Sequence, residues 1–180
     1  MKAAIYTKYG PPEVVQILEI DKPVPNDNEV MIKVMASTVN RTDCGFRSAQ
    51  YFISRFFSGL FVPKFKTLGN EFSGIIEAVG KNVSTFKTGD KIFGYNDTKF
   101  GAHAEYMTIA ENEAITTMPA NFNFAEAAPL TEGGHYALCD IRAANVKAGQ
   151  NVLINGATGA IGSAALQLVK YFGANVTAVG

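Results

Sequence analysis

The chain has 180 residues with sixteen basic and sixteen acidic side chains, so its formal net charge is zero. This length suits one complete domain, or one domain with part of a second. Without an excess of positive charge, neither a nucleic acid nor an anionic membrane surface is an expected partner. The hydrophobic fraction of 47% is ordinary for a globular chain, and the 17 glycines favour a fold with many turns.

Nothing in the sequence predicts export or a membrane span. The N-terminal stretch MKAAIYTKYGPPE has neither the apolar core nor the cleavage site of a secretory signal. The most apolar run, Tyr51–Phe65, is too short to cross a bilayer and contains Arg55 and Lys64. Cys44 and Cys139 lie far apart and outside any CxxC pattern, which favours two reduced, buried thiols. We therefore expect a cytoplasmic protein.

The chain up to about Pro119 predicts an all-β fold. Residues Val30–Ser37 alternate, which places Val30, Ile32, Val34 and Ala36 on one face of a strand. Glycine, proline, asparagine or aspartate separates most of the apolar runs, a pattern typical of a barrel or sandwich of short strands. The further strands that we expect are Lys2–Thr7, Gly74–Val79, Lys91–Phe93, Ala104–Ile109 and Glu113–Met118.

The pattern changes to alternating helix and strand at Asn121. Asn123 followed by Glu126 predicts an N-terminal capping box, and Pro129 interrupts the helix that it opens. A second helix is expected over Glu132–Ala143, and a buried strand over Asn151–Asn155. We therefore divide the chain into residues 1–122, a β domain, and residues 123–180, the start of an α/β domain.

After the strand at Asn151–Asn155, apolar residues recur at the three- and four-residue spacing of one helix face up to Phe172. Gly173 stands where a left-handed C-terminal cap is expected, and Asn175–Val179 reads as the next strand. This strand, glycine turn, helix and second strand form the context in which a glycine-rich turn binds a dinucleotide phosphate.

The turn would hold a pyrophosphate on backbone N–H groups at the positive end of the helix dipole. Gly159 permits close backbone approach, and Gly162 lets the helix lie tight on the strand. The candidate cofactor-binding residues are Gly156, Ala157, Thr158, Gly159, Ala160, Ile161 and Gly162. The residue that separates NAD from NADP is expected about 20 positions past the turn, beyond Gly180.

Five segments in a specific order resemble the medium-chain dehydrogenase/reductase superfamily, in its zinc-independent quinone oxidoreductase-like branch. They are ASTVNRTDCGFRSA (Ala36–Ala49), LGNEFSGIIEAVGKNV (Leu68–Val83), FKTGDKIFG (Phe86–Gly94), GAHAEYM (Gly101–Met107) and VLINGATGAIGSAALQLVK (Val152–Lys170). The resemblance implies a mixed β and α/β fold: a GroES-like β barrel, the catalytic domain, followed by the first βαβ unit of an incomplete NAD(P)-binding Rossmann domain. It also implies an N-terminal fragment, inactive by itself.

Two departures from the superfamily's zinc enzymes imply that no zinc is bound. Their Cys-x-Thr-Asp motif reads Asn40-Arg41-Thr42-Asp43 here, and their Gly-His-Glu motif reads Gly69-Asn70-Glu71. A thiolate and an imidazole are thus replaced by carboxamides, which are weak zinc ligands. The region of the third ligand, near Leu130–Glu132, holds no cysteine, and the lobe that carries four clustered cysteines for the structural zinc is absent.

The resemblance implies catalytic roles for three residues. Asn40 would lie near the nicotinamide and hold a carbonyl or a water, with an ordinary turn asparagine as the alternative. Thr42 matches the hydroxyl of the zinc enzymes' proton relay. Tyr51 would hydrogen-bond a quinone or enone oxygen at the substrate cleft. For its aromatic neighbours, a role in packing is favoured over a role in lining the substrate pocket. These neighbours are Phe52, Phe56, Phe57 and Phe61.

For three further polar residues a structural role competes with a chemical one. Glu71 reads first as a carboxylate hydrogen-bonded inside the barrel. His103 is expected in the strand that includes GAHAEYM, in a structural role. His135 could face the substrate cleft from its helix.

The function implied by the resemblance is transfer of a hydride from the reduced cofactor NADPH to a quinone, enone or carbonyl acceptor, with NAD (as NADH) also possible in place of NADP and no zinc. A small-molecule substrate and a homodimer are expected, and no nucleic acid or membrane partner. The alternative is an NADPH sensor or structural protein on the same scaffold without turnover.

Overall fold

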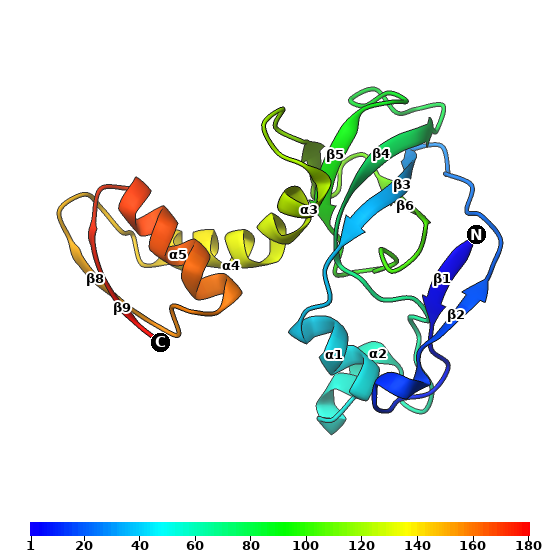
Figure 1. The fold of residues 1–180 in the computed structure, drawn as a ribbon, viewed down its shortest axis with the longest axis horizontal. Helices are drawn as coiled ribbons and strands as arrows, with labels where there is room; N and C mark the ends of the chain where they lie inside the picture. Colours follow the sequence, from blue (N-terminus) through cyan, green and yellow to red (C-terminus); the bar gives the residue numbers. More distant parts are fainter. The chain divides into compact units, whose positions relative to one another are not determined.

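A computed structural model describes residues 1–180, except for the side chain of Ser54. The chain forms two compact units, Met1–Ala128 and Pro129–Gly180 (Figure 1). The sequence predicted a boundary between residues 122 and 123, where the cofactor domain would begin. That domain boundary stays a prediction.

The N-terminal unit is built on an antiparallel sheet of five strands in the order β6-β3-β4-β5-β7. A separate hairpin pairs β1 (Lys2–Ile5) with β2 (Gln16–Glu19). Bridges at Ala3–Ala104 and Ile5–Thr67 connect β1 to neighbouring loops. The sheet consists of β3 (Glu29–Ser37), β4 (Glu71–Val79), β5 (Lys91–Tyr95), β6 (Tyr106–Ala110) and β7 (Ile115–Thr117).

The predicted mixed β and α/β fold is confirmed, with one difference in the β part. The ladders between the named strands form open sheets and do not close into a hydrogen-bonded barrel over the residues described. Strand β2 was not predicted, because Gln16–Glu19 is exposed along its whole length and shows no alternation. His103 was expected in a strand, but it lies in the bend before β6.

The core of this unit follows the alternation predicted for β3. Val30 and Ile32 have no exposed surface, and Val34 packs against the same cluster. A register shift between Val34 and Ala36 on the β4 side interrupts the alternation there. The other buried members of the cluster are Phe72, Ile76, Phe86, Ile92, Ala102, Met107 and Ile109.

Short helices join the strands of the N-terminal unit. Helix α1 (Arg41–Ser48) follows β3, and a 3-10 turn (Phe52–Ser54) with α2 (Arg55–Ser58) comes next. The capping box predicted at Asn123 opens α3 (Phe124–Ala127), and the 3-10 turn Ala128–Leu130 follows it at Pro129 as expected. Another 3-10 turn (Pro12–Val14) lies between β1 and β2.

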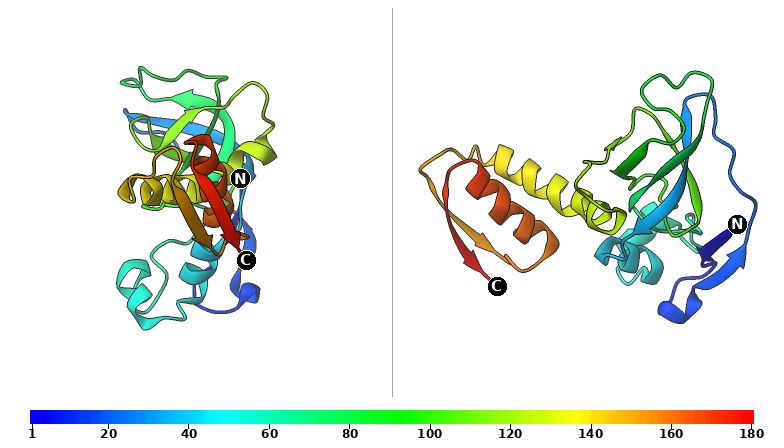
Figure 2. Two further views of the ribbon diagram at one scale, coloured as in Figure 1. Left: turned by 90° about the vertical axis from the view of Figure 1, so that its left-hand side faces the viewer. Right: turned by 45° about the horizontal axis from the view of Figure 1, so that its top comes forward.

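The C-terminal unit contains α4 (Thr131–Ala143), β8 (Asn151–Asn155), α5 (Ala160–Tyr171) and β9 (Asn175–Val179). β8 and β9 pair in parallel, in register from Asn151–Asn175 to Asn155–Val179. Helix α5 packs against both strands and against α4, as Figure 2 shows from two sides. The predicted strand, turn, helix and strand are therefore present, with Gly173 in the left-handed conformation after α5.

Two expectations about the chain as a whole can be compared with the structure. Across the described residues, no helix is both long and apolar enough to cross a bilayer. Cys44 and Cys139 are free, as predicted, but both are exposed rather than buried.

Two glycines give the turn between β8 and α5 its shape. Gly156 has φ +76°, a left-handed conformation that costs glycine little. A Cβ atom on Gly162 would lie 2.1 Å from the carbonyl oxygen of Gly156, so any larger side chain must push the helix away from the turn. The helix therefore begins in direct backbone contact with the turn.

We predict that Gly162→Ala lowers the free energy of unfolding of the C-terminal unit by about 1–3 kcal/mol, the usual cost of overpacking. Gly134→Ala in α4 is the matched control, because a Cβ there meets nothing within 4 Å. The control should be neutral or gain up to about 1 kcal/mol from the higher helix propensity of alanine. Urea denaturation of both variants measures the two changes, and equal stabilities would contradict the contact.

The carboxylate of Glu29 at the start of β3 is buried and fixed by three hydrogen bonds. The backbone and side-chain nitrogens of Asn26 donate to Oε2 at 3.1 and 2.9 Å, and Lys99 Nζ lies 3.3 Å from Oε1. Burial acts to raise the pKa of Glu29, but the bonds from Asn26 and Lys99 outweigh it and hold the pKa below its usual value. The charged form therefore stabilises the fold.

Because the folded pKa of Glu29 is depressed, its contribution to stability is present above the unfolded pKa, about 4.3. The contribution is lost as the pH falls through the folded value. We predict that Glu29→Gln lowers the free energy of unfolding by about 1 kcal/mol at neutral pH, and that the difference shrinks in acid. Urea denaturation at several pH values tests this, with Glu13→Gln at an exposed position as the control. A difference that does not change with pH would refute it.

Candidate cofactor and substrate sites

The seven predicted cofactor-binding residues form one continuous turn and helix start. The N–H of Ala157 donates to the carbonyl of Val179 at 2.9 Å, which joins the turn to the end of β9. Gly159 N–H donates to the Gly156 carbonyl at 3.2 Å and closes the turn itself. Thr158 and Ile161 have exposed side chains, and Ala160 is the first residue of the helix.

The N-terminus of α5 has no acceptor of its own for its free N–H groups. Gly159 is the N-cap and makes no side-chain bond, and the first turn carries no acidic residue. The first N–H groups of a helix have no partner inside the helix. Helices α1 and α3 satisfy theirs with the capping boxes of Asn40 and Asn123. Helix α5 is thus suited to receive an anion such as a pyrophosphate.

Asn40 is the N-cap of α1, so its turn position has a defined structural role. Its Oδ1 accepts the N–H of Asp43 at 3.1 Å, and the Asp43 carboxylate accepts the N–H of Asn40 at 3.1 Å. Its Nδ2 donates to Oδ1 of Asn70 at 2.6 Å. One N–H of the Asn40 carboxamide is left by these bonds, because an amide nitrogen carries two hydrogens.

Asn70 is completely buried, and its Nδ2 has no hydrogen-bond partner among the described residues. Two zinc ligands would each lie about 2.0–2.3 Å from a metal ion between them. The carboxamides of Asn40 and Asn70 instead form a hydrogen bond directly with each other. The described residues also contain no group of three or more His, Cys, Asp or Glu side chains that could hold a metal ion. The donor set at the zinc-motif positions does not fit zinc.

Asp43 is the buried carboxylate that organises this region. It is 2% exposed, and its Oδ1 accepts the N–H of Gly69 at 2.8 Å in addition to the bond from Asn40. His103 Nε2 lies 3.8 Å from Oδ2 of Asp43 and 2.7 Å from the carbonyl of Thr38. Because a carbonyl only accepts, Nε2 carries a hydrogen. This bond is consistent with the structural role predicted for His103, which stays a prediction, whereas its predicted place in a strand was wrong.

Sequence reasoning missed Asp43 as the centre of this network, and it missed α1. The signal was present, because Asn40 and Asp43 have the same three-residue spacing as Asn123 and Glu126. A capping box with aspartate at its third position differs from the usual glutamate or glutamine.

Glu71 lies inside the N-terminal unit as predicted. It is 4% exposed, and its carboxylate accepts the hydroxyl of Thr38 at 2.7 Å. Thr42 lies half-buried in the first turn of α1. His135 is exposed on α4, with its ring 5.3 Å from that of Tyr136.

Tyr51 precedes the 3-10 turn and is 71% exposed. We expected its aromatic neighbours to pack rather than to line a pocket, but the structure leaves their rings largely on the surface. Phe52, Phe56, Phe57 and Phe61 are 64–85% exposed. The rings of Phe52 and Phe56 contact each other, with centroids 5.7 Å apart in an edge-to-face arrangement.

Comparison with known proteins supports the predicted resemblance. The family model of the alcohol dehydrogenase GroES-like domain matches residues 26–120. A quinone oxidoreductase from Sus scrofa is 37% identical over 180 residues, which cover 98% of this chain and 51% of that protein. The chain thus spans about half the length of the curated relatives that it matches.

Solved structures show the same similarity. The quinone oxidoreductase from Coxiella burnetii matches with a TM-score of 0.88 at 30% identity, over 99% of this chain and 56% of that one. The Escherichia coli quinone oxidoreductase, solved in complex with NADPH, matches with a TM-score of 0.85 at 27% identity, over 100% of this chain and 53% of that one. The chain therefore belongs to the alcohol dehydrogenase GroES-like domain family, in the quinone oxidoreductase-like branch of the medium-chain dehydrogenase/reductase superfamily.

Proposed function

We propose that the protein is a zinc-independent, NADPH-dependent oxidoreductase that reduces a quinone, an enone or a related carbonyl acceptor. The observation that carries the proposal is the open N-terminus of α5, in a βαβ unit whose relatives include a quinone oxidoreductase solved with NADPH. NADH is the alternative hydride donor to be compared with NADPH. When bound, the nicotinamide supplies the hydride, and the protein positions it and excludes water.

The backbone N–H groups at the start of α5 would hold the pyrophosphate. Gly159 supports this assignment, because a Cβ there would meet only the Gly156 carbonyl, at an ordinary 3.6 Å. Packing within the chain thus does not require glycine at this position, whereas close approach of a phosphate to the backbone does.

Asn40, Thr42 and Tyr51 are the proposed hydrogen-bonding groups for the substrate oxygen. The carboxamide of Asn40 has one N–H left by its bonds to Asp43 and Asn70, and the phenol of Tyr51 lies on an exposed side chain. Hydrogen bonds polarise a carbonyl less than a metal ion does. Such a site favours conjugated acceptors, which accept a hydride readily, over simple carbonyl compounds.

We propose in addition that residues 1–180 alone consume NADPH at a negligible rate, because they supply one βαβ unit for a cofactor that binds across a larger sheet. A homodimer and a cytoplasmic location also remain predictions. Light scattering of the purified protein would test the dimer.

Gly159→Asp tests the phosphate site without weakening the helix. Aspartate is a favoured N-cap residue and the backbone at Gly159 is extended, so thermal stability should stay equal or rise. Its carboxylate would occupy the anion position, and NADPH binding should fall by about tenfold or more. Gln167→Glu, exposed on the same helix, adds the same charge away from the turn and should bind normally. Fluorescence titration with NADPH measures both, and equal affinities would refute the site.

The reaction is tested by mixing the protein at its full natural length with NADPH and a panel of quinones and enones. The absorbance of NADPH is then followed over time. Consumption of NADPH that does not require zinc is the expected result. Tight binding without consumption would instead favour the sensor or structural alternative. Measurable turnover by residues 1–180 alone would overturn the proposal that this part is inactive.

A further inference from the structure

Asn70 is a fully buried residue to which the proposed reaction assigns no role. It directly precedes β4, and its backbone carbonyl accepts the N–H of Asn96 at 2.7 Å. Its side chain contacts the proposed substrate-binding amide, because Asn40 Nδ2 donates to Asn70 Oδ1 at 2.6 Å. Since Asn70 has no exposed surface, it can act on a substrate only through Asn40.

The capping box of α1 determines which atoms of the two carboxamides face each other. Asn40 Oδ1 accepts the backbone N–H of Asp43 at 3.1 Å, so this oxygen is used by the helix start. The nitrogen of the Asn40 carboxamide therefore faces Asn70, and only the oxygen of Asn70 can accept its hydrogen. The two bonds together fix the plane of the Asn40 carboxamide and the direction of its second N–H.

This orientation leaves the nitrogen of Asn70 without a partner. Its Nδ2 is buried, and none of the residues that the structure describes accepts a hydrogen bond from it. An unsatisfied buried donor destabilises a fold, because the group has lost its hydrogen bonds to water. An apolar side chain of similar volume would fill the same space without this cost. Packing alone therefore does not require an asparagine at position 70.

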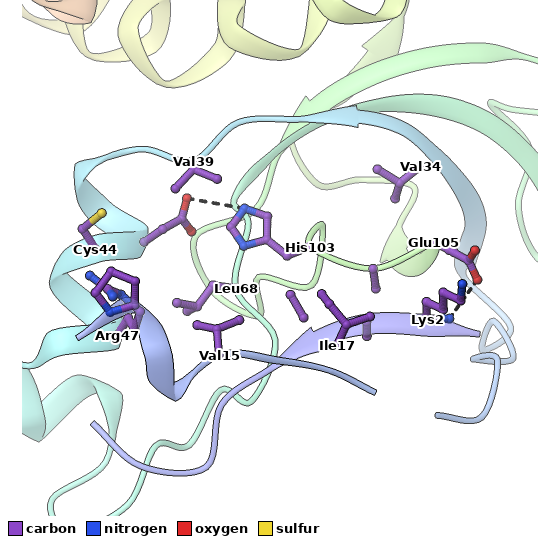
Figure 3. A pocket seen from close by; sticks show the side chains of 15 residues that line it. Lys2, Val15, Ile17, Val34, Val39, Cys44, Arg47, Leu68, His103 and Glu105 are labelled. Atoms are coloured by element: carbon purple, nitrogen blue, oxygen red, sulfur yellow. Dashed lines mark hydrogen bonds and ion pairs between the residues drawn. The ribbon is translucent and has the colours of Figure 1, made fainter. Parts of the chain in front are cut away.

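The backbone around Asn40 is held by bonds that do not involve Asn70. The carbonyl of Thr38 lies 2.7 Å from His103 Nε2. His103 Nε2 also lies 3.8 Å from Oδ2 of Asp43, the contact drawn as a dashed line at His103 in Figure 3. The Asp43 carboxylate in turn accepts the backbone N–H of Asn40 at 3.1 Å. What Asn70 adds is thus a bond to the side chain of Asn40.

We propose that Asn70 is a positioning residue, whose Oδ1 holds the Asn40 carboxamide so that its second N–H is directed at the substrate oxygen. This role rests on the proposed function of Asn40 as the amide that binds this oxygen. Negative charge develops on the oxygen as the hydride is transferred, and a donor held in place stabilises that charge best. Without the bond to Asn70, the Asn40 carboxamide is free to turn away.

Three variants of the protein at its full natural length test this role by NADPH consumption with a quinone. Asn70→Leu removes the acceptor for Asn40, so kcat should fall about tenfold or more with little change in KM. Asn40→Ser keeps a favoured N-cap side chain but removes the amide, and should lower kcat at least as much. The double variant should be no slower than Asn40→Ser alone, because Asn70 acts only through Asn40.

Thermal stability separates positioning from a structural role. Asn70→Leu also removes the unpartnered donor, so its melting temperature should stay equal or rise although kcat falls. Asn96→Ala is the matched control, because Asn96 is also buried but its Oδ1 accepts hydrogen bonds from Thr98 and Lys99. The control should lose thermal stability and keep the kcat of the wild type.

Nitrogen-15 NMR of the same protein provides a measurement that does not depend on turnover. One carboxamide proton of Asn40 should exchange slowly with solvent because it is bonded to Asn70, and Asn70→Leu should abolish this protection. A wild-type protein that consumes no NADPH would overturn the proposed function together with the catalytic part of the role of Asn70. With an active wild type, an unchanged kcat in Asn70→Leu, a slower double variant or unchanged protection of Asn40 would overturn the role of Asn70 alone.

Discussion

The buried carboxylate of Asp43 is the interaction on which the N-terminal unit's candidate sites depend. It accepts backbone N–H groups from Asn40 and Gly69, and so joins the start of α1 to the loop that leads into β4. His103 lies beside it, from the bend before β6. A carboxylate this deeply buried is stable only when its oxygens are hydrogen-bonded. The backbone around it therefore has to keep this arrangement.

The way Asp43 is used has a direct consequence for Asn40. Asn40 is held as the N-cap of α1, with its carboxamide directed to Asn70, which defines the position of the proposed substrate-binding amide. The Asp43 carboxylate accepts the backbone N–H of Asn40 in the same capping box. One buried carboxylate thus orients the proposed site.

The C-terminal unit uses the opposite solution at a helix start. Helices α1 and α3 neutralise their N-termini with their own side chains, whereas α5 begins with a glycine and has no acidic residue in its first turn. The contact between Gly162 and the Gly156 carbonyl holds the helix against the turn. Backbone N–H groups that no side chain of the helix caps are the groups that recognise a phosphate at a helix start.

Much of the fold and the glycine turn could be predicted from the sequence, because these features depend on neighbours in the chain. Alternation along β3, the capping box at Asn123 and the order of strand, turn and helix at Asn151–Tyr171 are local patterns, and the structure contains all of them. The family could be identified for the same reason, since its markers are short segments in a defined order. Strand β2 of the hairpin could not be predicted from the sequence, because its exposed residues carry no periodic pattern.

The sequence by itself determined most of the strands, the helices of the C-terminal unit, the order of the two units and the replacement of zinc ligands by carboxamides. The tertiary structure alone decided which side chains of distant segments share a hydrogen bond. Asn40 and Asn70 are 30 residues apart, and Asp43 and His103 belong to segments that meet only when the sheet has formed. It also decided that Phe52 and Phe56 stay on the surface. Burial and pairing depend on long-range packing, which no local pattern in a single sequence records.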